Sequence, residues 1–251
     1  MEPLDLRDVE VFVNENIVDF HERKIRSLEN LTLKRLLNKN PYLFKAKYLE
    51  TGTSFIQNLL DAFLSSSEEK LFGDFLEELA IFVAGKTCNG HKSSAQGIDL
   101  ELFHNDVHYI ISVKSGTNWG NSSQHNKLQQ DLKTAETRIK QSKFGTNVQP
   151  VLGICYGKTK TSFVRGYLKV VGQNFWYLIS ENKDLYKEII EPIGYEAKAH
   201  KERFEKERIR LINKFTVLFM QEFCDADYSI LWEKVVEYNS GNFDLDKVIN
   251  Y

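Results

Sequence analysis

Near the middle of the chain, a segment that alternates apolar with polar residues is followed by a run of β-forming residues, and this pair restricts the possible folds more than any other feature. Residues 97–103 read GIDLELF, and residues 108–114 read HYIISVK. A period of two is typical of a β-strand, and Asn105 and Asp106 lie where a tight turn would join two strands. The sequence therefore predicts a β-hairpin over residues 97–114.

The position of this turn predicts which residues face each other across the hairpin. If the turn is centred on Asn105 and Asp106, the numbers of paired residues add to 211, and Asp99 lies opposite Ser112. Side chains alternate between the two faces of a sheet, and paired residues share a face. One face is then predicted to carry Asp99, Glu101, Ser112 and Lys114, and the other, against the core, Ile98, Leu100, Ile111 and Val113. A shift of the register by one residue would destroy this arrangement.

Most of the remaining chain has apolar residues at helical spacing. Helices are predicted over residues 5–37, 51–64, 65–84, 124–142, 183–191, 195–223 and 227–238, and further strands over 148–156 and 163–170. Asn40-Pro41 is expected to end the first helical run, and the capping-box spacing of Ser66 and Glu69 to begin the third helix.

This order of elements predicts an α/β (α+β) fold, with a small central mixed β-sheet flanked by helices. No internal repeat or linker marks a domain boundary. A single domain is therefore expected over residues 1–251, with helical parts at 1–64 and 181–251 around a core at 65–180.

The helix before the hairpin contains an acidic residue within its apolar stripe. The stripe of the segment 71–83 is formed by Leu71, Phe75, Leu79, Phe82 and Val83. Glu78 is expected to fall inside this stripe, and Glu77 to point elsewhere. An acid on a buried helix face must be paired, neutral or bound to a metal ion. Glu78 is therefore a candidate partner of the hairpin carboxylates, unless its carboxylate reaches water at the edge of the stripe.

The polar face of the hairpin has the residue types that magnesium chemistry on a phosphate requires. Two or three oxygen ligands hold Mg²⁺, and the metal activates a water and polarises the phosphate. A lysine beside the metal can position that water and stabilise developing charge. Lys114 is followed by a loop rich in Ser, Gly and Asn over residues 115–123, which can approach a ligand closely. A solvated polar face with a salt bridge would show the same pattern.

Composition narrows the possible classes of protein. The net charge of −2 shows no overall basic character, so a nucleic-acid-binding role would need a local basic surface. No apolar segment is long enough for a membrane span, and the acidic N-terminus does not resemble a secretory signal. Cys88, Cys155 and Cys224 are widely spaced, as expected for free thiols in the cytoplasm. No P-loop or dinucleotide motif is present, so no nucleotide cofactor is expected.

Gly97-Ile98-Asp99 on one strand and Ser112-Val113-Lys114 on the next resemble the motif of the PD-(D/E)XK nuclease superfamily, in particular its type II restriction endonucleases. Phe72-Gly73 with Glu78, and the segment GQNFW at 172–176, are also similar to parts of that family, so the resemblance covers residues 66–180. Two positions depart from the pattern. Ile98 replaces the motif proline, and Ser112 replaces the second acid.

The resemblance implies a Mg²⁺-dependent endonuclease that hydrolyses double-stranded DNA at a specific sequence. It implies that Asp99 is the central metal ligand, that Glu78 is a migrated second acid, and that the Val113 carbonyl is a third ligand. Glu101 is the alternative for the second acid. Lys114 is then the catalytic lysine, and Ser112 occupies a catalytic position without supplying a carboxylate.

The resemblance also implies a DNA surface and an assembly. The residues expected at the DNA are Asn118, Trp119, Asn121, Ser122, Ser123, Gln124 and Lys127. The sequence offers further candidates for phosphate contacts at Lys133, Arg138, Lys140, Lys143, Lys158, Lys160, Arg165 and Lys169. A homodimer is expected because two-fold symmetry matches a palindromic site, in the cytoplasm of a bacterium or a phage-infected cell. Two alternatives remain open, namely a repair or phage nuclease of the same fold and a catalytically inactive DNA-binding protein.

Overall fold

The computed structural model describes residues 2–142, 145–195, 197–241 and 243–244. The chain forms two compact units. The first, called the sheet unit, comprises residues 1–20 and 70–196, and the second, called the helical unit, comprises residues 21–69 and 197–251. Two long helices, α1 (Leu6–Glu29) and α4 (Gly52–Cys88), contribute to both units. The expectation of a single domain stays a prediction.

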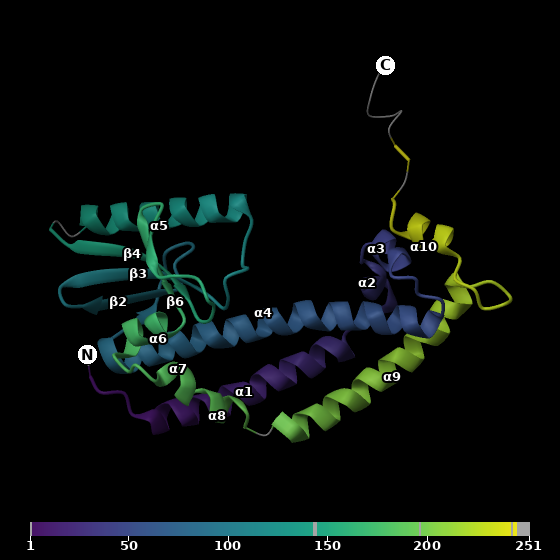
Figure 1. Ribbon diagram of the computed structural model, residues 1–251, viewed down its shortest axis with the longest axis horizontal. Coiled ribbons are helices and arrows are strands. Elements are labelled where there is room, and N and C mark those ends of the chain that lie inside the picture. The colour runs from purple at the N-terminus through teal and green to yellow at the C-terminus, as the bar shows by residue number, and fades with distance from the viewer. Residues whose placement is uncertain (1, 143–144, 196, 242, 245–251) are drawn as a thin grey trace, which may run out of the picture. The chain divides into compact units, whose positions relative to one another are not determined.

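The sheet unit contains one mixed sheet (Figure 1), as the sequence predicts, but the sheet has six strands where four were expected. The strands are β1 (His91–Lys92), β2 (Leu100–His104), β3 (Val107–Lys114), β4 (Asn147–Ile154), β5 (Ser162–Val164) and β6 (Tyr167–Val171). Their order in the sheet is β1-β2-β3-β4-β6-β5. The pairs β3–β4 and β4–β6 are parallel, and the other pairs are antiparallel.

The register predicted for the hairpin is confirmed. Leu100 pairs with Ile111, and His104 pairs with Val107, so that the paired numbers add to 211. Asn105 and Asp106 have φ angles of 48° and 58°, the conformation that two-residue hairpin turns need and that Asn and Asp tolerate better than other residues with side chains.

The predicted strand over 163–170 is wrong in one respect, because it consists of two strands. β5 and β6 are joined by a second tight turn at Arg165 and Gly166, whose φ angles of 51° and 88° are both positive. Gly166 adopts its positive φ without strain, and the resulting hairpin forms the edge of the sheet.

The two helices predicted over 51–84 are a single helix of 37 residues, α4. Ser66 does not cap a new helix. Its Oγ donates to the carbonyl of Ala62 at 3.0 Å, a bond that a serine inside a continuous helix makes with the preceding turn. The capping-box spacing of Ser66 and Glu69 is therefore coincidental.

The first helical run ends earlier than predicted, because α1 stops at Glu29 and α2 (Leu33–Leu37) is separate. Asn40-Pro41 begins a helix and does not end one, because α2 already ends at Leu37 with Asn38 as its C-cap. The Asn40 side chain accepts from the backbone N–H groups of Tyr42 and Leu43, and Pro41 occupies the first turn of α3 (Pro41–Ala46).

Both faces of the sheet are covered by helices (Figure 1). On one face, Leu128 and Leu132 of α5 (Ser122–Ser142) pack with Ile110 and Leu152. On the other, α1, α4 and α6 (Gln173–Ser180) pack on residues such as Leu100, Ile111 and Val113.

Ile98 was expected to lie beside Leu100 and Ile111, and this prediction is wrong. Ile98 packs in the cluster beneath α5 instead. Its N–H donates to the carbonyl of Ala95 in a turn before β2 begins, so the alternation of the strand does not extend back to this residue.

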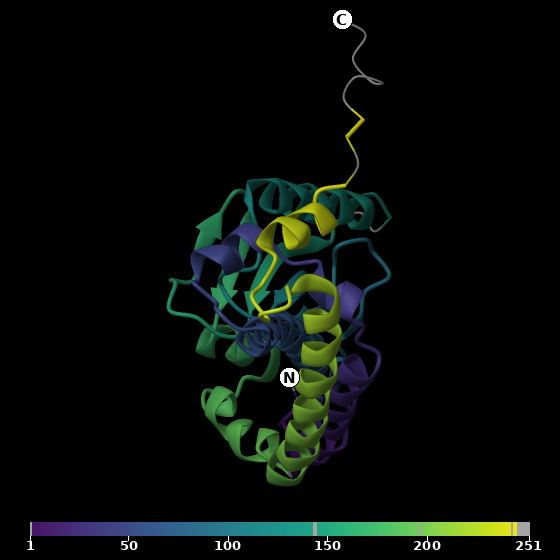
Figure 2. The ribbon, with the colours of Figure 1, turned by 90° about the vertical axis from the view of Figure 1, so that its right-hand side faces the viewer.

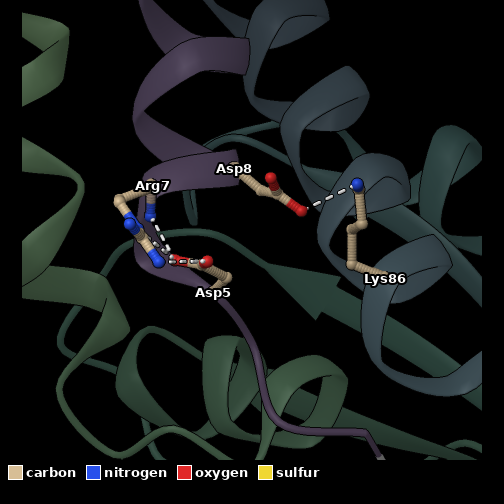
Figure 3. Close-up of polar contacts among 4 residues, drawn as sticks. All are labelled: Asp5, Arg7, Asp8 and Lys86. Atoms are coloured by element: carbon tan, nitrogen blue, oxygen red, sulfur yellow. Dashed lines mark hydrogen bonds and ion pairs between the residues drawn. The ribbon is translucent and has the colours of Figure 1, made fainter.

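The beginning of α1 is joined to the end of α4 within the sheet unit (Figure 3). Lys86 Nζ lies 2.8 Å from Asp8 Oδ2, and Asp5 accepts from the backbone N–H of Arg7 at the first turn of α1. Both partners of the Asp8–Lys86 pair are about half exposed, so it orients the helices more than it stabilises them. The buried contacts between Val9, Val13 and Val83 supply the packing.

The helical unit has a separate core that is rich in phenylalanine. Phe55 of α4 packs against Phe219 of α9 (Ala197–Phe223) and against Trp232 of α10 (Trp232–Tyr238). Two short helices, α7 (Leu185–Glu188) and α8 (Ile190–Ile193), replace the single helix predicted over 183–191 and belong to the sheet unit.

Gly153 offers a test of packing in the sheet unit. A Cβ atom at this buried position of β4 would lie 2.6 Å from ring carbon Cδ2 of Phe175. We expect Gly153→Ala to destabilise the protein by about 1–3 kcal/mol because the core has no room for the added methyl group. Urea unfolding measures the change. Adding Phe175→Leu should restore part of the lost stability, and equal stability of wild type and Gly153→Ala would contradict the packing described.

Candidate active site

The polar residues of the hairpin gather where β2 begins and β3 ends. Asp99 precedes β2, and its N–H donates to the carbonyl of Ile111 at 2.9 Å, which extends the pairing of the two strands. Ser112 lies opposite, and Lys114 is the last residue of β3. The turn at the far end of the hairpin therefore brings together residues that are 13 and 15 positions apart in the sequence.

Asp99, Ser112 and Lys114 are in direct contact, as the register predicted. Asp99 Oδ2 accepts from Ser112 Oγ at 3.1 Å and from the N–H of Val113 at 2.6 Å. Lys114 Nζ lies 3.6 Å from the same oxygen. It also donates to Ser112 Oγ at 3.3 Å and to the Val113 carbonyl at 2.7 Å. These contacts orient the carboxylate of Asp99 and the ammonium of Lys114 toward each other.

The second oxygen of Asp99 is open to a ligand. Among the residues that the structure describes, Oδ1 accepts no hydrogen bond, while Oδ2 accepts two. The Asp99 side chain is 22% exposed and that of Lys114 is 30% exposed, whereas Ser112 is buried. A carboxylate with one oxygen anchored and the other accessible can bind a cation without losing its orientation.

The prediction that Glu78 lies on the buried face of its helix is wrong, because Glu78 is exposed and Glu77 is the acid near the hairpin. Leu76 and Ala80 are both buried, so the centre of the apolar stripe is rotated away from Glu78. Including these two residues in the stripe would have placed Glu77 at its edge. Gly73, one turn earlier in α4, lies against Ser115, directly after the lysine.

Burial raises the pKa of Glu77, and the negative charge of Asp99 raises that pKa further. Lys92 and Lys114 lower it, and Lys92 Nζ lies 3.6 Å from Glu77 Oε1. A divalent cation bound next to Glu77 would stabilise its charged form, because it would offset both the burial and the negative charge of Asp99.

Glu101 shares the Asp99 face of β2 but has partners of its own. Its Oε1 accepts from Ser93 Oγ at 2.5 Å, and its Oε2 lies 2.9 Å from His108 Nε2. Both carboxylate oxygens are thus engaged with protein groups. The alternative ligand role suggested for Glu101 would require these contacts to be given up.

The family model described as type II restriction endonuclease EcoO109I matches residues 7–201. The chain belongs to this family. The match covers β2, β3 and the helix carrying Glu77, so the geometry above lies within the part shared with these restriction endonucleases. No curated protein matches the chain significantly.

Membership of the restriction endonuclease family makes DNA the substrate class and phosphodiester cleavage the class of reaction. Within the described ranges, no three His, Cys, Asp or Glu side chains gather closely enough to hold a metal ion. A metal here would therefore need main-chain oxygens and water besides two carboxylates.

In the same residues, no helix combines the length and apolar character needed to cross a bilayer.

The loop after Lys114 contains most of the residues expected at the DNA. Trp119 is half-buried, with its ring 5.9 Å from Lys114 Nζ and 4.3 Å from the ring of His125. Asn121 and Gln124 bond to each other's backbone N–H groups, a reciprocal cap at the start of α5. Their side chains thus already have a structural role. Asn118, Ser122, Ser123 and Lys127 are exposed.

A hollow of about 230 Å³ lies beside this loop. It is lined by the aromatic residues Trp119, His125 and Tyr167, by apolar residues such as Leu152, and by the cations Arg165 and Lys169. No acidic residue lines it among the part of the chain described. Aromatic rings next to cations are suited to a nucleotide.

Adjacent glutamates provide a matched test of the site. We expect Glu77→Gln to reduce metal-dependent DNA cleavage by about 100-fold or more, because it removes a carboxylate beside Asp99. Glu78→Gln should cleave as wild type does, because this side chain is exposed. Cleavage rates on duplex DNA of varied sequence measure both.

Thermal stability gives a second test of the position of Glu77. The folded-state pKa of Glu77 is raised, so its ionised form costs stability at neutral pH and this cost disappears as the pH falls below the unfolded-state pKa. Without metal, Glu77→Gln should therefore melt above wild type at neutral pH, and the difference should shrink in acid. An equal loss of DNA cleavage in Glu77→Gln and Glu78→Gln would contradict the placement of Glu77 at the active site.

Proposed function

We propose that the chain is a type II restriction endonuclease that hydrolyses phosphodiester bonds of double-stranded DNA at a specific sequence, with Mg²⁺ as its metal. The observation that carries this proposal is the contact of Lys114 with an Asp99 carboxylate whose second oxygen is accessible. Family membership supports the DNA substrate. The site suits magnesium because all its candidate ligands are oxygens.

The residues proposed to hold the metal are Asp99, Glu77 and the carbonyl of Val113. Asp99 offers its accessible Oδ1, and Glu77 lies in a place where a nearby cation would offset the unfavourable burial of its charge. The Val113 carbonyl accepts from Lys114 Nζ, so the lysine and the metal would compete for it. When bound, Mg²⁺ would polarise the scissile phosphate and lower the pKa of a coordinated water.

Lys114 is the proposed catalytic lysine. Asp99, Ser112 and the Val113 carbonyl hold its ammonium group at the end of β3. From there its charge can stabilise the negative charge that develops on the phosphate, and one of its protons can orient the attacking water. Ser112 replaces the acid of the family motif. Its proposed role is to position both Asp99 and Lys114 through one hydroxyl.

The DNA is proposed to lie over the edge of the sheet formed by β5 and β6 and the loop that contains Trp119. Residues 137–180 contain seven lysines and arginines and no aspartate or glutamate. Arg138, Lys158, Lys160 and Arg165 are exposed, as is Lys133. Lys140 is also exposed but pairs with Glu136 at 2.6 Å, and Lys143 lies outside the described residues. This local excess of positive charge supports phosphate contacts although the whole chain is slightly acidic.

Cleavage of defined plasmids tests the proposed function. We expect discrete fragments with Mg²⁺ and none with EDTA, because the metal supplies the activated water. Asp99→Asn and Lys114→Ala should lose activity by about 100-fold or more while their melting behaviour remains that of a folded protein. A smear would favour a nuclease without sequence specificity. Absence of cleavage on varied DNA by wild type would favour a catalytically inactive DNA-binding protein.

A homodimer is also proposed, acting on DNA in the cytoplasm. Cutting both strands of a symmetric site calls for two active centres related by a two-fold axis, and the site described here has one Asp99–Lys114 pair. Sedimentation of the Asp99→Asn variant on a cognate duplex should give a mass of two chains per duplex. A single chain bound at concentrations where wild type cuts both strands would exclude the homodimer.

A further inference from the structure

The strongest unexplained feature outside the catalytic hairpin is a basic surface on α2 and α3 of the helical unit. Residues 30–49 contain five basic residues and no acidic one. These residues are Lys34, Arg35, Lys39, Lys45 and Lys47. All except the half-buried Lys39 are exposed. A chain with a net charge of −2 therefore concentrates positive charge in one short segment.

This positive charge is not neutralised by neighbouring acids. Among the described residues, none of these five cations forms an ion pair with a carboxylate. The arginines of α9, in the same unit, behave differently. Arg203 pairs with Glu22, Arg208 with Asp61 at 2.7 Å, and Arg210 with Glu207. Like charges without acidic partners repel one another, and a polyanion would relieve that repulsion.

Buried residues and helix caps fix the backbone of α2 and α3. Leu36 and Leu37 of α2 and Phe44 of α3 are buried in the core of the helical unit. Thr32 caps α2, and Asn40 caps α3. Figure 2 shows α3 beside α10, against which it packs. The charged side chains thus project from a fixed backbone.

Aromatic rings lie among these cations. Tyr42 and Tyr48 are 68% and 81% exposed, which is unusual for large side chains in such a short segment. Lys45 Nζ lies 5.0 Å from the ring of Trp232, and Lys47 Nζ lies 5.0 Å from that of Phe44. Exposed cations interspersed with tyrosines are typical of surfaces that follow a phosphate backbone.

We propose that the α2–α3 surface binds the phosphate backbone of duplex DNA and is a second DNA contact, separate from the catalytic hairpin. The proposal rests on the proposed function, since it takes the same duplex as the ligand. The α2–α3 surface belongs to the helical unit, whereas Asp99 and Lys114 belong to the sheet unit. The α2–α3 surface should therefore strengthen DNA binding without altering the rate of the chemical step.

The test compares two charge-reversal variants in the full-length protein. The first carries Lys34→Glu, Lys45→Glu and Lys47→Glu. The control carries the same change at three exposed lysines of α9, Lys198, Lys201 and Lys206, where Glu202 and Glu205 lie between them. Binding to a fluorescent duplex is measured over a series of salt concentrations, with Ca²⁺ in place of Mg²⁺. Melting curves establish that each variant is folded, and a milder variant with glutamine at positions 34, 45 and 47 is measured alongside.

We expect the α2–α3 variant to bind DNA about tenfold or more weakly at low salt. Its slope of log affinity against log salt should fall by about two to three, because each lost phosphate contact removes about 0.9. The glutamine variant should show the same reduction in slope, and the control variant should retain the wild-type slope. Single-turnover cleavage at saturating enzyme should stay within about twofold of wild type.

Three outcomes would overturn the proposal. An unchanged slope in the α2–α3 variant would do so, as would an equal reduction in the control. The third is an α2–α3 variant that binds DNA as wild type does but no longer binds vesicles of anionic phospholipid. That result would indicate that the surface binds membranes. If wild type cleaves DNA and the slope is unchanged, only this inference fails. If wild type neither binds nor cleaves DNA, the proposed function fails as well.

Discussion

The turn at Asn105 and Asp106 is the constraint on which the candidate site depends. Its two positive φ angles allow β2 and β3 to pair in one register only, and that register places Asp99 beside Ser112. The backbone N–H of Val113 then anchors one oxygen of Asp99, and Lys114 reaches the same oxygen. A different register would move these side chains to opposite faces and remove the site altogether.

The ionised carboxylate of Glu77 at the candidate active site lowers the stability of the folded protein. Glu77 is partly buried near a second carboxylate, and its raised pKa reflects the unfavourable energy of holding that charge there. The apolar packing around it is extensive, with Leu76 and Leu79 on one side of the helix nearly or fully buried. Such packing can sustain an unfavourable charge that becomes favourable when a cation binds.

Charge is distributed unevenly along the chain, and this has a functional meaning. The acid-free stretches at 30–49 and 137–180 lie in different structural units, yet each concentrates cations on exposed side chains. Net charge reports only the sum of such regions. A slightly acidic protein can therefore contact a polyanion at more than one place, and its affinity will depend on salt according to the local number of phosphate contacts.

The hairpin, its register, the mixed sheet and the meeting of Asp99, Ser112 and Lys114 could be predicted from the sequence, because alternation and turn chemistry act between near neighbours. The sequence did not determine the phase of α4. Glu77 and Glu78 differ by 100° around a helix, and only packing against the sheet decides which one turns inward. The continuity of α4 through Ser66 and the burial of Ile98 beneath α5 were likewise decided by tertiary contacts. Local patterns predict an element, whereas the orientation of its side chains depends on residues far away in the sequence.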